Sequence, residues 1–205
     1  VIPIDMPIAP SLEGEEAPSP SISKSMTQIL RNADQLPELF DRLVGSMERS
    51  DMRMEFIEID EFLRTNIVPM YENDSRFKLV IEPPVSSSTS AYVDPFALKQ
   101  VITNIMDNAI KHGFTDANKR YNLYIFQGEN TIVIANDGTS PSIELHEMKL
   151  RGRSAGPNPG SGEGIYWADL LMQRMGGSLY AVHNDSEILQ TPVSFSIFVD
   201  LPTTT

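Results

Sequence analysis

The 205-residue sequence contains no cysteine, which excludes disulfide bonds, thiolate metal sites and cysteine nucleophiles. Its three histidines, at positions 112, 146 and 183, are too scattered to predict a histidine metal cluster. Basic residues are few: 16 Lys and Arg stand against 28 Asp and Glu, a net charge of −12 that argues against a general nucleic-acid or anionic-membrane binder. No apolar run approaches the roughly 20 residues of a membrane span. A nucleotide site remains compatible with this net charge, because a metal ion and one or two nearby cationic side chains are enough to bind the phosphates.

What the sequence does contain predicts a globular domain behind two extra segments. Hydrophobic residues make up 40% of the chain, enough to bury a core. Residues 1–24 hold five prolines and three glutamates and are predicted to be a linker or irregular segment. Residues 25–50 carry apolar side chains at helical spacing and predict a long helix, interrupted at Pro37. Its narrow apolar stripe would pack either on a partner helix or on the rest of this domain.

Residues 51–205 alternate between helical and strand patterns. Asp60 is predicted to be the N-cap of one helix; Asp94-Pro95 is a typical start of another, and Gly113 a typical helix end. The predicted elements are a strand at 55–59, a helix at 60–71, a strand at 77–81, a helix at 94–112, a hairpin of 121–127 and 131–135, a helix at 163–175, and strands at 178–182 and 193–199. Residues 83–90 are predicted to form an exposed loop. Residues 136–162 are too long for an ordinary connection, and loops of that length usually have a function.

One face of the helix at 94–112 carries unusual polar residues. Asn104, Asp107, Asn108 and Lys111 follow the spacing i, i+3, i+4 and i+7, which places them on a common face. Asparagine in mid-helix is unfavourable for helix stability, so the pattern favours a compensating role. Amide and carboxylate oxygens suit a hydrated Mg²⁺ and Lys111 suits phosphate, although a solvated face fits the same pattern.

Two further motifs flank the long loop. Gly160-Ser161-Gly162-Glu163-Gly164 opens a helix, and its glycines leave backbone N–H groups free to approach an anion. No Lys-Ser/Thr pair follows it, and no strand leads directly into it, so it matches neither nucleotide fingerprint that places glycines before a helix. Asn136-Asp137-Gly138 follows an apolar strand and, taken alone, is typical of a simple turn.

In this order the motifs resemble the ATP-binding domain of sensor histidine kinases, which belongs to the gyrase, Hsp90, histidine kinase and MutL ATPase group. Residues 104–112 resemble the family's N box, and residues 160–165 resemble its second glycine box. Asn136-Asp137-Gly138 stands where the first glycine box is expected, and Met175 to Leu179 resembles the family's ending. The resemblance covers about residues 52–201. It implies an α+β fold, a two-layer α/β sandwich with helices on one face of a mixed sheet (the Bergerat-type fold), preceded here by the long helix.

The resemblance also implies ATP and Mg²⁺ as ligands of residues 51–205. Asn108 is the implied metal ligand, assisted by Asn104 and Asp107, and the implied catalytic residues are Asn104, Asn108 and Lys111. The implied nucleotide-binding residues are Asn104, Asn108, Lys111, His112, Asn136, Asp137, Gly138, Gly160, Gly162, Gly164 and Ile165. His112 fits a helix C-terminal cap equally well. ATP-hydrolysing relatives carry a glutamate base at position 104; an amide cannot take that proton, so Asn104 favours transfer to a protein side chain.

Several positions depart from the family pattern. The adenine-recognising aspartate aligns with Asn136. An asparagine can accept from the adenine 6-amino group and donate to N1, which would keep adenine selectivity; the alternative is that Asp137 is shifted into that role. Glu163 is acidic where a small or apolar residue is common. Lys149, Leu150 and Arg151 replace the usual phenylalanine pair of the lid, and Arg151 and Arg153 would either reach the triphosphate or remain solvated.

The helix at 25–50 resembles part of a kinase's dimerisation and phosphoacceptor helical hairpin, but residues 1–50 contain no histidine. Either the acceptor helix lies before Val1, or the substrate is another chain, or the kinase is degenerate. Two functions therefore remain open. The first is the catalytic part of a histidine kinase, serving a response regulator and acting on the dimerisation helices of the same or a partner chain, in a homodimer and on the cytoplasmic side of a membrane-anchored sensor. The second is a degenerate kinase that senses nucleotide or serves as a scaffold. An anti-sigma-type serine kinase is a third option, but those chains usually lack the extra helix. None of these binds nucleic acid.

Overall fold

The computed structural model describes residues 52–82, 90–153, 162–183 and 191–203. All of them belong to the second of two units into which the chain divides, Met52–Thr205. The predictions for residues 1–24 and 25–50, and for Gly160, lie outside the described residues. The elements, in chain order, are β1 (Glu55–Glu58), α2 (Ile59–Asn66), α3 (Val68–Tyr71), β2 (Phe77–Ile81), β3 (Ser90–Val93), α4 (Pro95–Asn108), the π-helical turn η1 (Ala109–Gly113), β4 (Tyr121–Gln127), β5 (Thr131–Asn136), α5 (Leu145–Met148), α6 (Gly164–Met175), β6 (Ser178–His183) and β7 (Phe195–Asp200).

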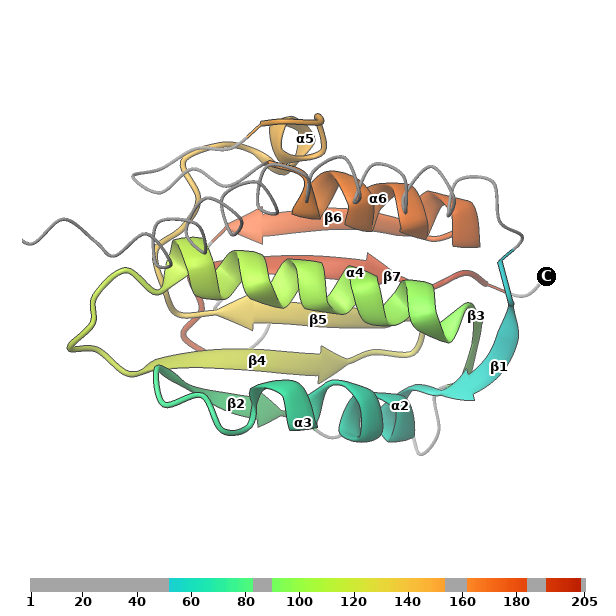
Figure 1. The fold of residues 1–205 in the computed structure, drawn as a ribbon, viewed down its shortest axis with the longest axis horizontal. Helices are drawn as coiled ribbons and strands as arrows, with labels where there is room; N and C mark the ends of the chain where they lie inside the picture. The colour runs from blue at the N-terminus through green and yellow to red at the C-terminus, as the bar shows by residue number, and fades with distance from the viewer. Residues whose placement is uncertain (1–51, 83–89, 154–161, 184–190, 204–205) are drawn as a thin grey trace, which may run out of the picture. The chain divides into compact units, whose positions relative to one another are not determined.

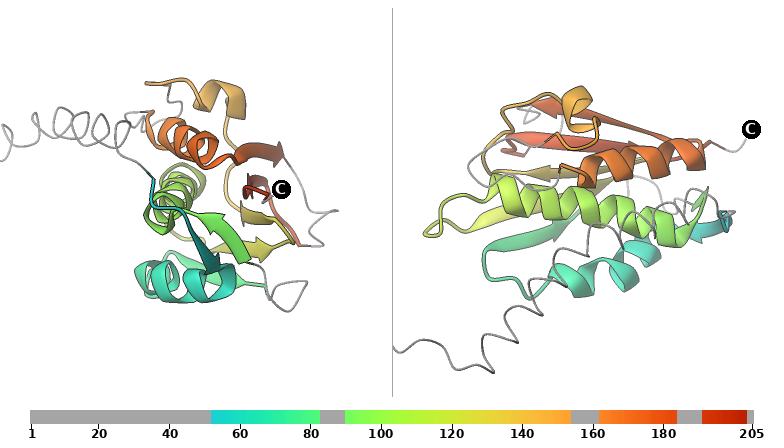
Figure 2. Two further views of the ribbon diagram at one scale, coloured as in Figure 1. Left: turned by 90° about the vertical axis from the view of Figure 1, so that its right-hand side faces the viewer. Right: turned by 45° about the horizontal axis from the view of Figure 1, so that its top comes forward.

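Five of the strands form one mixed sheet. Their order is β2-β4-β5-β7-β6; β2 runs parallel to β4, and every other neighbouring pair is antiparallel. Helices α4 and α6 lie side by side across one face, with α2 beside them, so the sheet and the helices form two layers (Figures 1 and 2). Strands β1 and β3 make a separate antiparallel pair. This confirms the predicted α+β sandwich.

Strand β4 shows why the two faces of the sheet differ. Its side chains alternate, and Leu123 and Ile125 are fully buried between the sheet and the helices. Tyr124 and Phe126 point to the other face, where their rings stack at 5.8 Å. Both faces of the strand are therefore apolar: the helices cover one, and on the other Tyr124 packs with Ala135 and Val193.

Helix α4 begins as its sequence predicts. The Asp94 side chain accepts a hydrogen bond from the Ala97 backbone N–H at 3.0 Å, and Pro95 occupies the first helical position. Fully buried Leu98, Val101 and Ile102 hold the helix against the rest of the core. Because the start and the buried face of α4 are fixed in this way, its opposite side is also fixed, and that side carries the polar stripe.

The structure corrects three details of the predicted elements. The helix expected at 60–71 breaks at Ile67 into α2 and α3, with Pro69 in the first turn of α3, where a proline is tolerated. Asp60 is not the N-cap of α2; it lies in the first turn and pairs with Arg64 at 2.9 Å. The α-helical part of α4 ends at Asn108, and η1 continues it with the wider π-helical winding to Gly113.

Two short elements were not predicted from the sequence. Strand β3 forms at the end of the segment expected to be a loop and pairs with β1. Helix α5 lies inside the long loop and is held by a capping box, in which Glu144 and Glu147 bond reciprocally to backbone N–H groups. Each has only four residues, too few for a hydrophobic period to stand out.

Candidate functional site

The described parts of the three predicted motifs lie near one another within the unit Met52–Thr205. The end of α4 and the end of β5 lie at the left of Figure 1, and α6 begins beside the middle of α4 and runs to the right. A Cβ placed on Gly164 would lie 3.9 Å from the carbonyl oxygen of Asn104, so α6 begins directly beside the polar stripe. The backbone N–H of Thr139 donates to the carbonyl of Gly113 at 2.8 Å, which ties the turn after β5 to the end of η1. The motifs thus form one constellation although 60 positions separate the first from the last.

The polar stripe of α4 is available to a ligand. Asn104 and Asn108 are half-buried, while Asp107 and Lys111 are exposed. No described residue forms a hydrogen bond with either asparagine side chain or an ion pair with Lys111. The wider winding of η1 turns Lys111 away from the angle that an unbroken α-helix would give it. Amide oxygens and a cation without protein partners match the needs of an oxygen-seeking metal and an anion.

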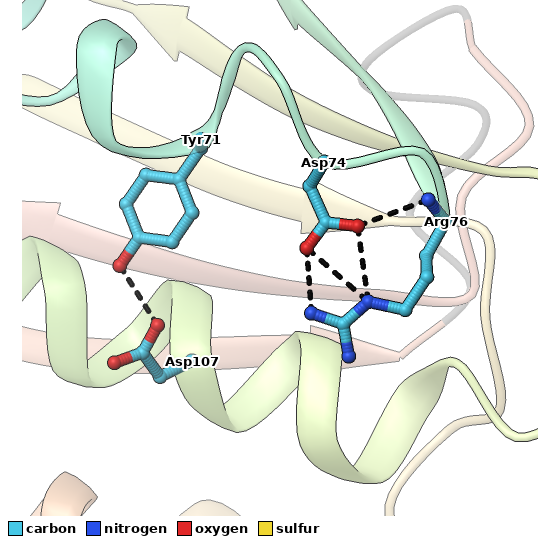
Figure 3. A network of polar contacts seen from close by, with 4 residues as sticks. All are labelled: Tyr71, Asp74, Arg76 and Asp107. Carbon is cyan, nitrogen blue, oxygen red and sulfur yellow. Dashed lines mark hydrogen bonds and ion pairs between the residues drawn. The ribbon is translucent and has the colours of Figure 1, made fainter.

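Asp107 is held by a residue that the sequence did not single out. The Tyr71 hydroxyl, on α3, donates to Oδ1 of Asp107 at 2.8 Å (Figure 3). Burial raises the pKa of Tyr71, and the hydrogen bond and charge of Asp107 raise it further, so the phenol keeps its proton. The same view shows Asp74 binding the backbone N–H and the guanidinium of Arg76, which stabilises the turn between α3 and β2. No sequence motif links α3 to α4, so only their packing reveals this contact.

Asn136 is buried at the centre of the constellation, with 3% of its surface exposed. Its Oδ1 accepts a hydrogen bond from the backbone N–H of Gly138 at 3.0 Å. A Cβ on Gly113 would come within 3.0 Å of this oxygen, and one on Gly138 within 2.9 Å. The two glycines are therefore required by close packing around the amide oxygen.

The neighbouring Asp137 is occupied elsewhere. Its Oδ1 accepts from the backbone N–H of Asn122 at 2.9 Å, and its Oδ2 accepts from the Asn122 side chain at 2.7 Å. Lys119 donates to its backbone carbonyl at 3.1 Å. Both carboxylate oxygens thus face β4. The alternative in which Asp137 takes the base-recognising role is not supported by these contacts.

At the start of α6, the carboxylate of Glu163 forms an ion pair with Arg151. Nε of Arg151 lies 3.1 Å from Oε1 of Glu163, and the Arg151 guanidinium lies 5.6 Å from the centre of the Trp167 ring. Gly162 has φ +68°, and a Cβ there would meet the Arg153 backbone at 2.5 Å. The two described ends of the loop, around Arg153 and Gly162, therefore lie against each other. Because Glu163 is paired with Arg151, its negative charge repels an anion at the first turn of α6 less strongly, and the N–H groups of that turn can still attract one.

Lys149, another cation before the loop, has a structural role. Lys149 lies 2.7 Å from Oδ1 of Asp169 on α6 and also donates to the carbonyl of Leu179 on β6 at 2.7 Å. Gln173 donates to the second oxygen of Asp169 at 2.6 Å. This small network joins the end of α5 to α6 and β6. Lys149 is thereby engaged within the domain.

His112 is half-buried in η1. Burial lowers its pKa, and the charge of Lys111 lowers it further, so the ring is neutral at pH 7. A neutral imidazole both donates and accepts hydrogen bonds but does not attract phosphate as a cation. Ile165 is buried in the first turn of α6 and contributes packing.

These residues fit a metal-bound nucleotide better than a metal held by protein alone. No group of three or more His, Cys, Asp or Glu residues capable of holding a metal occurs among the described residues. Two free amides, one lysine and the N-terminus of a twelve-residue helix leave most metal positions to phosphate and water, as Mg²⁺ prefers. Within the same part of the chain, no helix combines the length and hydropathy that crossing a membrane requires.

Comparison with known proteins agrees with this arrangement. A sequence model described as "Histidine kinase-, DNA gyrase B-, and HSP90-like ATPase" matches residues 93–203. Histidine protein kinase SaeS of Staphylococcus aureus (strain USA300) is 23% identical over 181 residues, which cover 82% of this chain and 51% of SaeS. The chain therefore spans about half the length of the curated relatives it matches.

Solved structures share the fold. The catalytic domain of histidine kinase ThkA has a TM-score of 0.55 at 15% identity, covering 74% of this chain and 96% of that one. The mycobacterial sensor histidine kinase MprB gives 0.52 at 19% identity, with 74% and 99% coverage. Full-length ShkA in complex with AMPPNP gives 0.59 at 15% identity, with 89% and 39% coverage.

Proposed function

The chain belongs to the histidine kinase-, DNA gyrase B- and HSP90-like ATPase family, and from that membership we propose that it is the catalytic, nucleotide-binding part of a two-component sensor histidine kinase. In this proposal a nucleoside triphosphate with Mg²⁺ binds at the end of α4. The γ-phosphoryl group passes to a histidine of dimerisation helices on the same or a partner chain, and from there to a response regulator. The whole protein would act as a homodimer, with this part on the cytoplasmic side of a membrane-anchored sensor.

One observation carries the proposal: the backbone of Asn104 lies beside Gly164, where α6 begins, and no described residue forms a hydrogen bond with the side-chain amides of Asn104 and Asn108. Asn108 would hold Mg²⁺, with Asn104 and Asp107 assisting directly or through water. Mg²⁺ would neutralise charge that builds up during phosphoryl transfer. Lys111 would contact phosphate as a point charge, and the backbone at Gly160, Gly162 and Gly164 would cover the phosphates.

The remaining predicted residues would hold the nucleoside. Asn136 would meet the base, and Gly138 gives Asn136 the space it occupies. His112, neutral at pH 7, would hydrogen-bond near the sugar and phosphates. Because position 104 holds an amide, which cannot take a proton from water, the site favours transfer to a protein side chain over rapid hydrolysis. Catalysis would then rest on positioning and on electrostatic stabilisation.

A degenerate kinase is the second candidate, and Asn136 is the observation that favours it. An amide stands where the family carries a base-recognising carboxylate, so nucleotide binding without phosphotransfer, serving a sensing or scaffold role, is compatible with the site.

Calorimetric titration of the chain with a non-hydrolysable ATP analogue, with and without Mg²⁺, tests the binding step. We expect binding that depends on Mg²⁺ in the wild type and is lost in Asn108→Ala. The matched control is Asn130→Ala, because Asn130 is an exposed residue of the β4–β5 turn. Absence of binding at millimolar nucleotide would contradict the proposal.

Transfer is tested separately, with γ-labelled ATP and a histidine kinase dimerisation domain supplied in trans. Label on the histidine supports the kinase, and nucleotide binding without any label supports the degenerate form.

A further inference from the structure

The orientation of the Asn136 amide decides which chemical group this chain presents to a base. The backbone N–H of Gly138 bonds only to an acceptor, so the side-chain atom 3.0 Å away is the amide oxygen. That oxygen is enclosed by Gly113 and Gly138, whose Cα positions leave no room for even a methyl group next to it. The planar amide then directs its nitrogen away from both glycines.

The nitrogen is the polar atom left for a ligand. No described residue accepts a hydrogen bond from Nδ2 of Asn136, and Asp137, the nearest carboxylate in the sequence, is bound to Asn122 through both of its oxygens. An amide N–H that loses water without gaining an acceptor is unfavourable, so a base that supplies an acceptor at this point is preferred. Adenine sets its 6-amino group against this donor and can offer only N1 as an acceptor, whereas a 6-oxo group is itself an acceptor at position 6.

We propose that Asn136 makes this a donor-type base site, one that prefers purine nucleotides with a 6-oxo group, guanine or hypoxanthine, over adenine with its 6-amino group. This inference rests on the proposed function, because it concerns the base of the same nucleotide. The site would reject the wrong base because that base leaves a buried polar group of the protein without a hydrogen-bond partner.

The first test needs no variant. Mg²⁺-dependent binding of ATP, GTP and ITP to the wild-type chain is measured by calorimetry under identical conditions. ITP is the decisive probe, because it differs from ATP at position 6 and at the N1 proton only. We expect ITP to bind at least threefold more tightly than ATP. Binding of ATP as tightly as ITP, or more tightly, overturns the inference.

The second test converts the donor to an acceptor. In Asn136→Asp one carboxylate oxygen still accepts from Gly138, and the other faces the ligand. We expect the ratio of ATP to ITP affinity to rise at least tenfold; a rise of less than threefold overturns the inference. Asn130→Asp, at the opposite end of β5, introduces the same charge in an exposed turn and is expected to leave the ratio unchanged.

The two proposals fail in different ways. If neither the wild type nor Asn136→Asp binds any of the three nucleotides, the proposed function fails. If ATP binds selectively to the wild type, the proposed function stands and the donor-type site is wrong.

Discussion

Tyr71 and Asp107 lie 36 positions apart in the sequence, yet the Tyr71 hydroxyl donates to Oδ1 of Asp107 at 2.8 Å. The bond joins α3, at the edge of the helical layer, to the polar stripe of α4 (Figure 3). It fixes one oxygen of Asp107 and leaves the other for water or a metal-bound ligand. The stripe is thus held from outside its own helix.

Tyr71→Phe is expected to lower the free energy of unfolding by about 1 kcal/mol, because the ring stays packed while a buried hydroxyl's bond is lost. Asp107→Ala is expected to have a similar effect, and the double variant is expected to lose less than the sum of the two. Urea denaturation measures all three. Tyr92→Phe is the control, since 39% of the surface of Tyr92 is exposed. An additive double variant would show that the two residues act independently.

Gly138→Ala is expected to destabilise the domain by about 2 kcal/mol, because the new Cβ would meet the Gly113 carbonyl oxygen at 2.5 Å. The carbonyl of Gly113 belongs to the backbone at the end of η1, so it cannot move aside without disturbing η1. Gly128→Ala is the matched control: its Cβ would come no nearer than 3.5 Å to any atom outside its neighbours. Thermal unfolding compares the two variants. Equal losses would mean that the close approach at Gly138 relaxes freely.

His112 is expected to make the domain less stable at acidic pH. Its pKa is lowered in the folded state, by burial and then by Lys111, so the unfolded chain binds the proton first as the pH falls below about 6.5. Stability contributed by the neutral ring is therefore present above that pH and is lost below it. The difference in unfolding free energy between pH 7.5 and pH 5.5 is expected to shrink in His112→Gln. His146→Gln, at an exposed position of α5, should retain the wild-type difference between the two pH values. If both variants changed this difference equally, His112 would not be the cause of the pH dependence.

The Lys149–Asp169 pair is expected to matter more than a surface ion pair. Only 12% of the Asp169 side chain and 25% of the Lys149 side chain are exposed. Lys149→Met leaves the carboxylate without its cation and is expected to cost about 2 kcal/mol in chemical denaturation. Arg64→Met removes the exposed Arg64–Asp60 pair and is expected to leave stability almost unchanged, because exposed ion pairs contribute little. Similar losses in both would show that burial of the Lys149 pair adds nothing.

The sequence predicts most of the fold where a hydrophobic period is long or a turn residue is distinctive. The strand Phe77–Ile81 and the start of α4 at Asp94-Pro95 follow directly from such signals. Strand β3 and helix α5 were missed because four residues are too few to show a period. Gly113, the last residue of η1, accepts a hydrogen bond from the Thr139 N–H, a contact that only the tertiary structure reveals.

For the site, the sequence indicated the stripe and the glycine motifs but not their partners. That Asn136 turns its oxygen to Gly138 while Asp137 turns both of its oxygens to Asn122 follows from the geometry of the strand end. The sequence Asn-Asp reads the same whichever of the two side chains faces the site, so it does not predict which one does. Tyr71 left no signal at all, because nothing along the chain relates α3 to Asp107.

The Arg151–Glu163 pair predicts an interaction between two variants in nucleotide binding. With Arg151 present, the carboxylate at the start of α6 is paired at 3.1 Å. In Arg151→Ala that carboxylate is left near the expected phosphates, and repulsion across a partly exposed site is expected to weaken Mg²⁺-nucleotide affinity about fivefold. Calorimetry on the variant measures the loss, and Arg64→Ala, on α2, is the control for removing an arginine.

Adding Glu163→Gln to Arg151→Ala distinguishes how Arg151 acts. If its task is to neutralise Glu163, the double variant loses the repelling charge and is expected to bind nucleotide within about twofold of the wild type, since no uncompensated anion remains at the helix N-terminus. If Arg151 instead contacts the triphosphate directly, removing the Glu163 charge recovers little, and the double variant stays as weak as Arg151→Ala. The ion pair and its position above Trp167 favour the first outcome, because they direct the guanidinium toward α6.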